Sequence, residues 1–278
     1  GGVGCAAMLR LAARRRRRYL RIAGCCARNG LVRELGFRAN FVMTVLSELL
    51  WLGMMLVFVE IIFNNTSSVR GWNNYQYLFL MGTHFVITSL FVVFFFGNLQ
   101  RLSELIRTGG LDFVLLKPVQ PQFLLSLERM DYAAGANALL GLGLCGFAVQ
   151  RLGVRFGAVD VGLFALLVAS GVFTLYGLMF IFSTSSVWLI RQTSASHFWF
   201  YLTSCARYPA EIYQPLARGT LWFVLTFVIP VLIVANLPAN AVVRGAHFQP
   251  WLVGYAVAAT IVIVVFSTVV FRWALRWY

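Results

Sequence analysis

The sequence predicts an all-α integral membrane protein whose chain crosses the bilayer six times. Hydrophobic residues make up 60% of its 278 residues, and its mean hydropathy is +0.79. Charged residues make up only 12%, whereas soluble domains carry about 25%. Apolar runs of about 20 residues recur, which is the length that a helix needs to cross a hydrocarbon core about 30 Å thick. This composition excludes a water-soluble globule.

Residues 1–38 form a basic segment before the first apolar run. They are predicted to be an arm with an amphipathic helix in the membrane plane, because most of their arginines share one helical face. These arginines are Arg10, Arg14, Arg17, Arg18, Arg21 and Arg28. Arg15 and Arg16 interrupt the apolar face, so a partly disordered arm is the alternative. The net charge of +14 could suit nucleic acid, but the apolar composition favours anionic lipids as partners, with no nucleic acid.

Residues 39–278 are predicted to form a single transmembrane domain. The six predicted spans are 39–63, 75–97, 132–149, 159–182, 187–206 and 251–273. The first is expected to remain in the protein, because no signal-peptide cleavage site follows it. The third is rich in Gly and Ala, as helix contacts in lipid often are. The fifth is the least plain, because it contains Arg191, Gln192 and His197.

The apolar stretch before the last span is interrupted by proline. Pro230 breaks it and Pro238 is expected to close it. Residues 214–243 are therefore predicted to form a re-entrant helix pair, whose freed backbone groups are satisfied by neighbouring protein.

The distribution of positive charge predicts the orientation of the chain. With both termini in the cytoplasm, the inside segments hold 17 Lys and Arg residues and the outside segments hold 6. Cytoplasmic segments usually carry the excess of these residues. If residues 187–206 did not cross, five spans would remain and the termini would lie on opposite sides, so we expect six.

The loop 98–122 is too polar to cross the membrane and contains a short helical pattern. Four apolar residues recur at helical spacing, namely Leu99, Leu102, Leu105 and Ile106. Three charged residues lie between them or directly after them, namely Arg101, Glu104 and Arg107. Gly109 and Gly110 follow and are expected to end the helix. The pattern predicts an amphipathic helix on the cytoplasmic side.

The sequence carries no motif for catalysis. A phosphate-binding loop needs a lysine after a glycine-rich turn, and the only lysine is Lys117, which Pro118 follows. His84, His197 and His247 lie in separate segments without the spacing of a zinc-binding pair. The cysteines show no metal-ligand spacing either. We therefore expect a non-catalytic subunit that binds no metal or cofactor itself.

Glu48 lies near the middle of the first predicted span. An ionised side chain there costs at least about 2.5 kcal/mol on insertion scales, so it must face protein, water or a partner. Two interpretations remain open. Glu48 lies on a substrate path or proton relay, or it has a structural role in which it pairs with Arg191 or His84.

Three blocks of the sequence together resemble one transporter family. Residues 107–118 read RTGGLDFVLLKP, residues 206–213 read ARYPAEIY, and a proline-containing stretch runs from Phe227 to Ala239. In this order they resemble blocks of the bacterial permeases in the type-2, or exporter, branch of the ABC transporters. The resemblance covers residues 14–278, nearly the whole chain.

This resemblance implies a permease subunit of an ATP-driven exporter in the bacterial inner membrane. Such permeases work as dimers of identical or homologous chains, with two copies of a cytosolic ATPase that binds ATP and Mg²⁺. The implied ATPase-coupling residues are Leu99, Arg101, Leu102, Glu104, Leu105, Arg107, Asp112 and Lys117. The implied outer gate comprises Tyr208, Pro209, Pro230 and Pro238. Glu48 and His84 are the candidate residues of the translocation path within the spans.

Two other functional classes stay open. A stand-alone secondary transporter or channel normally shows intramembrane charges at matched places in two repeats, and we find no convincing repeat. A lipid-modifying enzyme needs a convergent polar site at one membrane face, for which no motif is present. A neighbouring ATPase gene would favour the exporter, whereas ion-driven transport by the purified chain alone would favour the secondary transporter. No motif specifies the cargo.

Overall fold

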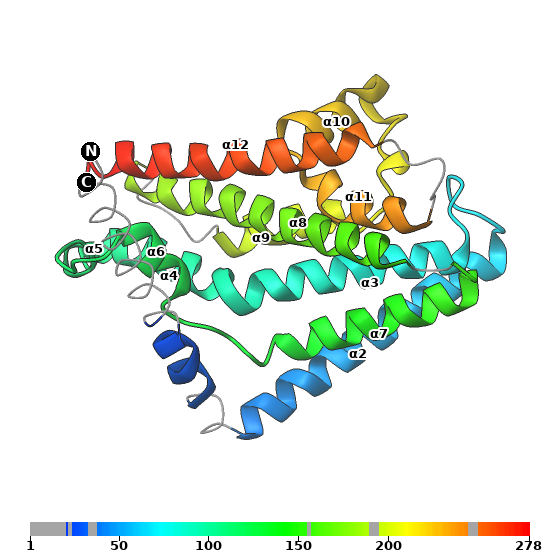
Figure 1. Ribbon diagram of the computed structural model, residues 1–278, viewed down its shortest axis with the longest axis horizontal. Helices are drawn as coiled ribbons and strands as arrows, with labels where there is room; N and C mark the ends of the chain where they lie inside the picture. The colour runs from blue at the N-terminus through cyan, green and yellow to red at the C-terminus, as the bar shows by residue number, and fades with distance from the viewer. Residues whose placement is uncertain (1–20, 22–23, 33–37, 155–156, 189–194, 244–249) are drawn as a thin grey trace, which may run out of the picture.

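The computed structural model describes residues 21, 24–32, 38–154, 157–188, 195–243 and 250–278. Within these ranges the chain is helical and contains no β-strand, so the all-α fold class is confirmed. Most helices run roughly along one direction (Figure 1). Helices α4, α5 and α6 gather at the end where the C-terminus lies, and the α2–α3 and α7–α8 connections lie at the opposite end.

Four helical stretches of the described residues are long and apolar enough to cross a bilayer. They are α2 (Arg38–Asn65), the continuous α3 (Asn74–Phe91), η1 (Val92–Phe96) and α4 (Gly97–Thr108), then α8 (Ala158–Thr184) with η2 (Ser185–Val187), and α12 (Trp251–Ala274). They confirm the four plainest predicted spans and make this an integral membrane protein. The second stretch is longer than expected, because α4 continues α3 without a break.

Two further helices lie at the remaining predicted spans. Helix α7 (Gly135–Leu152) covers most of the predicted third span, but it is not among the four stretches that are long and apolar enough to cross a bilayer. Helix α9 (Ala195–Ala206) covers the second half of the predicted fifth span. Residues 189–194, with Arg191 and Gln192, lie outside the described residues. The count of six spans therefore stays a prediction.

Helix α7 packs along α3 through small residues (Figure 1). A Cβ on Gly82 of α3 would lie 2.7 Å from Sγ of Cys145 and 2.8 Å from the carbonyl oxygen of Gly141, both on α7. These glycines let the two backbones approach closely, which is how helices associate where lipid supplies no hydrophobic drive. The Gly-rich composition of α7 thus serves helix contact.

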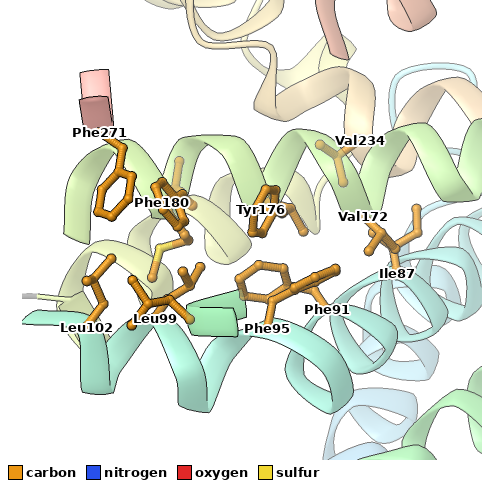
Figure 2. Close-up of a cluster of buried hydrophobic side chains, with 14 of the residues drawn as sticks. Ile87, Phe91, Phe95, Leu99, Leu102, Val172, Tyr176, Phe180, Val234 and Phe271 are labelled. Carbon is orange, nitrogen blue, oxygen red and sulfur yellow. The ribbon is translucent and has the colours of Figure 1, made fainter. Parts of the chain in front are cut away.

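A column of buried side chains joins the α3–η1–α4 stretch to α8 (Figure 2). Phe91, Phe95 and Leu99 on the first stretch face Tyr176 and Phe180 on α8. The ring centroids of Phe95 and Tyr176 lie 4.7 Å apart. This packing runs from the membrane-spanning part of the stretch into α4, so the two helices form one rigid body down to the end where α5 and α6 lie.

The apolar stretch before α12 is broken, as predicted. Helices α10 (Thr220–Phe223) and η5 (Val224–Val228) meet α11 (Val231–Val243) at a bend of 85°. Pro230 lies in this break, where its missing N–H and fixed φ interrupt the helix. The geometry fits either a re-entrant pair or one broken span, so the re-entrant assignment stays a prediction.

The prediction that Pro238 closes this stretch is wrong, because Pro238 lies inside α11. A proline there deprives the carbonyl oxygen of Val234 of its helical donor. That oxygen faces Gly171 of α8, where a Cβ would lie 2.9 Å from it. Close packing of α11 on α8 through this glycine therefore holds the helix together across the proline.

Short elements complete the described chain. Helices α5 (Leu111–Leu115) and α6 (Pro121–Leu127) follow α4, and η3 (Ala210–Ile212) and η4 (Leu216–Gly219) follow α9. Of the basic arm, residues 24–32 are helical, and the hydroxyl of Tyr132 donates a hydrogen bond to the carbonyl oxygen of Ala27 at 3.1 Å. The arginines in residues 1–20 lie outside the described residues.

Candidate functional site: an exposed tip and a cavity between helices

The structure divides the predicted coupling residues of α4 into buried and exposed sets. Leu99 and Leu102 are fully buried against the core of this chain, and Leu105 is partly buried. Glu104 and Arg107 are exposed. The apolar face of α4 is therefore occupied by α8 and its neighbours, and only the polar face is free to meet another protein.

A second apolar surface, which the sequence reasoning missed, lies just beyond α4. We call residues 109–118 the tip. Gly109 adopts a left-handed backbone conformation with φ of 73° and turns the chain into α5. Leu111 and Val114 point inward, whereas Phe113 is 74% exposed and Leu116 is 81% exposed. The signal was present in the sequence as apolar residues outside any span.

Polar side chains surround this exposed apolar pair. Asp112 and Lys117, two of the predicted coupling residues, are both exposed on the tip, and Arg107 lies at the end of α4 beside it. An apolar centre with a charged rim is the usual anatomy of a protein-binding patch.

The tip stands on a base held by buried polar contacts. Asn98 of α4 donates hydrogen bonds to the carbonyl oxygens of Ser126 and Arg129 at 3.0 and 2.6 Å, and accepts one from the Arg129 amide at 2.9 Å. The hydroxyls of Ser126 and Tyr176 lie 2.8 Å apart, which joins α6 to α8. Sequence reasoning did not single out Asn98, although an asparagine at the end of an apolar run signals such a contact. These bonds fix α6 to α4 and α8.

The chain after α12 lies beside the tip. Desolvation and the negative charge of Asp112 raise the pKa of Tyr278, and a hydrogen bond with the Leu111 backbone partly opposes this rise. The tip therefore receives contacts from both the α4–α6 segment and the last helix.

A partly open cavity of ≈ 190 Å³ lies between helices α2, α3, α7 and α9. It brings together Glu48 and His84, the two path candidates, which come from α2 and α3. Its other polar or aromatic lining residues are Trp51, Phe85, Thr88, Ser89, Asn137, Trp199, Thr203 and Arg207. Glu48 and His84 both lie near the middle of their predicted spans, which predicts mid-membrane depth for this part of the cavity.

Charges of both signs line the cavity. The guanidinium carbon of Arg207 lies 5.6 Å from the ring centroid of Trp51, a cation–π contact between α9 and α2. Among the described residues, Glu48 forms no ion pair with Arg207 and no hydrogen bond with His84. Arg191, the other partner considered for Glu48, lies outside the described residues.

The predicted outer-gate residues fall into two places. Pro230 and Pro238 line a narrow crevice of ≈ 10 Å³ between α8, α11 and α12. Tyr208 and Pro209 lie in the turn after α9, which Asn236 of α11 holds. The Asn236 side chain accepts a hydrogen bond from the Ala210 amide at 2.9 Å and donates one to the Tyr208 carbonyl oxygen at 3.1 Å. Sequence reasoning missed Asn236. The signal was its position as a polar residue inside an apolar run, which indicates a buried hydrogen-bonding role.

The described residues contain no group of three or more His, Cys, Asp or Glu side chains placed to hold a metal ion. The cysteines within the described ranges are free thiols. The described residues offer two features, an exposed apolar tip with charged neighbours and a partly open polar cavity between helices.

Comparison with known proteins identifies the family of this chain. The family of ABC-2 family transporter proteins matches residues 49–278. Neither the comparison with curated proteins nor that with solved structures gave a match. The match covers most of the chain and includes the tip, α8, α11 and α12. Of the residues named above as lining the cavity, Glu48 alone lies outside the matched range. The chain is therefore a membrane permease that belongs to the ABC-2 family of ABC transporter proteins.

Proposed function

We propose that this permease is the membrane-spanning subunit of an ATP-driven exporter and that a cytosolic ABC ATPase docks on its tip. The observation that carries this proposal is the exposed pair Phe113 and Leu116 at the end of a rigid helical body. Covering a large apolar side chain contributes roughly 1.5–3 kcal/mol relative to leaving it in water. A partner that covers both residues gains a small apolar centre of the kind that dominates protein interfaces.

The polar residues around this pair supply the specificity of docking. Glu104 and Arg107 extend the rim along α4, and Asp112 and Lys117 flank the apolar pair on the tip. Charged residues at the rim of an interface guide orientation and association rate more than they add affinity. In this proposal the buried Leu99 and Leu102 act indirectly, because they hold α4 against α8.

The continuous α3–η1–α4 stretch supports a mechanical role for the tip. A displacement of the tip is carried into the membrane, because α4 shares its buried core with α8 and continues directly into α3. Interfaces of this kind respond to a partner by rigid-body movement. ATP and Mg²⁺ would bind to the partner, since the sequence lacks a phosphate-binding loop, and the ATPase would supply all of the driving free energy.

Helix α2 supports assembly into a dimer. Only 6% of the most apolar 18-residue segment of α2 is buried inside this chain, against 67% for the corresponding segment of the α3–η1–α4 stretch. A polar cavity lies beside it and carries Glu48, which favours contact with protein or water over lipid. We propose that a second permease chain, identical or homologous, faces α2, and that two ATPase copies engage the two tips.

The proposed orientation follows from the charge distribution. Six spans with both termini in the cytoplasm place the tip and α6 inside the cell. In a bacterium the membrane would be the inner membrane, because ATP is available on its cytoplasmic side.

Replacement of the apolar pair tests the proposal. Phe113→Ser with Leu116→Ser should abolish co-purification of the ATPase and its stimulation by the permease. Stability should change little, because both side chains are exposed. Val32→Ser is the matched control, since Val32 is also an exposed apolar residue before the first span. Unchanged association of the double variant would contradict docking on the tip.

A further inference from the structure

The mid-membrane cavity between α2, α3, α7 and α9 is suited to one class of ligand. We infer that it binds a neutral, hydroxyl-rich, six-membered ring, that is, a glycosyl unit of the cargo. The inference rests on the proposed function only in that cargo must pass through this chain. It is carried by the size of the cavity, by its unpartnered polar atoms and by its balance of charge.

The size of the cavity suits a single ring. Its volume is ≈ 190 Å³, and a cavity of about 150 Å³ in another protein is large enough to hold benzene. The cavity is partly open, so the rest of a larger cargo can extend outward. A multi-ring ligand would not fit inside as a whole.

Two deeply buried polar side chains line the cavity with atoms that lack a partner. His84 and Asn137 are both more than nine-tenths buried, and within the described part of the chain neither Nδ1 of His84 nor Oδ1 of Asn137 has a hydrogen-bond partner. A buried polar atom left unpaired is destabilising, and native proteins leave few of them without a purpose. These atoms are therefore placed for a group that the cavity receives.

Other oxygens of the lining add acceptors. Thr88 and Thr203 donate their hydroxyl protons to carbonyl oxygens of their own helices, so only their lone pairs remain for a ligand. The carboxylate of Glu48 adds a further acceptor. Arg207 and the Asn137 amide also bring donors to the lining. Hydroxyl groups both donate and accept, so a ligand with several hydroxyls satisfies this mixed set.

The charges in the lining favour a neutral ligand. Glu48 and Arg207 contribute one negative and one positive charge, so the pair is balanced before a ligand enters. Arg207 already lies over the face of Trp51, which leaves that face unavailable to a second cation. An ammonium would add positive charge beside Arg207, and an anion would add negative charge beside Glu48. Net charge at this depth is costly, so a hydroxylated neutral ring is preferred.

The aromatic residues supply apolar walls for such a ring. Phe85 and Trp199 line the cavity together with Trp51, and Trp199 is held by stacking on Phe91 with centroids 4.6 Å apart. Aromatic walls with a few placed polar groups are typical of small-molecule sites. They can cover the C–H faces of a sugar while its hydroxyls reach the acceptors.

Direct binding to the isolated permease tests the inference. The chain is reconstituted in lipid nanodiscs without ATPase and titrated with radiolabelled octyl β-glucoside below its micelle concentration. Octylammonium and octyl sulfate, which share the alkyl chain, are the comparison probes. We expect saturable binding of the glucoside that is at least about tenfold tighter than that of either charged probe.

Substitutions locate the binding in the cavity. Asn137→Leu should weaken glucoside binding about tenfold, because it removes the amide while keeping the number and branching of the side-chain heavy atoms. Glu48→Gln should weaken it less. Glu60→Gln is the matched control, since Glu60 is an exposed residue of the same helix outside the cavity. His84→Phe is a second variant of the lining and should also weaken glucoside binding about tenfold. A thermal melt of each variant verifies that it folds.

The outcomes are separable from those of the proposed function. Tighter binding of either charged probe, absence of saturable binding, or unchanged glucoside affinity in both Asn137→Leu and His84→Phe overturns the inference. If the glucoside does not bind while the tip captures the ATPase, only the ligand assignment fails. If the glucoside binds while no ATPase associates, the proposed coupling fails instead.

Discussion

The guanidinium of Arg101 lies 2.9 Å from the carboxylate of Glu128, which joins α4 to the residue that follows α6. This positive charge belongs to the set that the sequence assigns to the ATPase contact. In the structure it pairs within the chain and helps to hold the base of the tip. Arg101 is therefore a positioning residue in our proposal, and Glu104 and Arg107 are the α4 residues that face a partner.

Exchange of these two charges separates the two roles of Arg101. Arg101→Glu should lower stimulation of the ATPase and destabilise the fold by no more than about 1 kcal/mol, the usual range for partly exposed ion pairs. The double variant Arg101→Glu with Glu128→Arg should recover most of both, because the pair is restored in reverse. ATPase assays and denaturant titrations of the two single variants and the double variant measure the coupling. If the double variant stays as defective as Arg101→Glu, the arginine acts on the partner directly.

The close contact between α3 and α7 predicts a clear difference between two glycines. Gly82→Ala should destabilise the permease by about 1–3 kcal/mol, because the new methyl group meets backbone and sulfur atoms of α7 that cannot move freely. Gly143→Ala on α7 is the control, since a methyl group there would meet no neighbouring atom within 4 Å. Thermal melts in detergent compare the two. Equal melting temperatures would show that the helices do not pack as described.

Gly109 gives a prediction about the turn into the tip. Gly109→Ala should cost about 1 kcal/mol, because its φ of 73° is a left-handed conformation that alanine adopts poorly. The strain falls on the direction of α5, so ATPase stimulation should fall more than stability does. Gly97→Ala serves as the control, because Gly97 has helical φ of −62° and open space around it. Wild-type stimulation in Gly109→Ala would mean that the turn is not needed for coupling.

The six-span topology predicts which face of the membrane each loop occupies. In a variant with all five cysteines replaced, a cysteine at Lys117 should react with a membrane-impermeant maleimide only from the cytoplasmic side. Cysteines at Asn65 and Arg151, at the far ends of α2 and α7, should react only from outside. Labelling of intact cells and of inverted vesicles makes the comparison. Cytoplasmic labelling at Arg151 would show that α7 does not cross.

Sequence reasoning was strongest where a single physical requirement dominates. The hydrophobic thickness of a bilayer sets the length of α2, α8 and α12, so their limits agree with the predicted spans within a few residues, as does the start of α3. The end of α4 was predictable for a similar reason, because Gly109 supplies the left-handed conformation that ends a helix.

Contacts between distant segments were beyond the sequence. The pattern in α4 correctly showed an apolar face, but amphipathicity does not state whether that face meets this chain or a partner, and Leu99 meets α8. Pro238 was expected to end a helix, because local rules do not register the support that Gly171 gives to α11. The neighbours of Glu48 were likewise undetermined, since Arg207 and Asn137 lie far from it in the chain.

Site-specific photo-crosslinking at the tip tests the central claim most directly. A benzophenone amino acid at Leu116, which is 81% exposed, is introduced into the full chain in its native cells, and Phe147 near the outer end of α7 carries the same probe as the control. We expect Leu116 to crosslink to a chain that contains a phosphate-binding loop and Phe147 not to do so. Crosslinking of Leu116 only to lipid, or only to proteins without a phosphate-binding loop, would contradict the account.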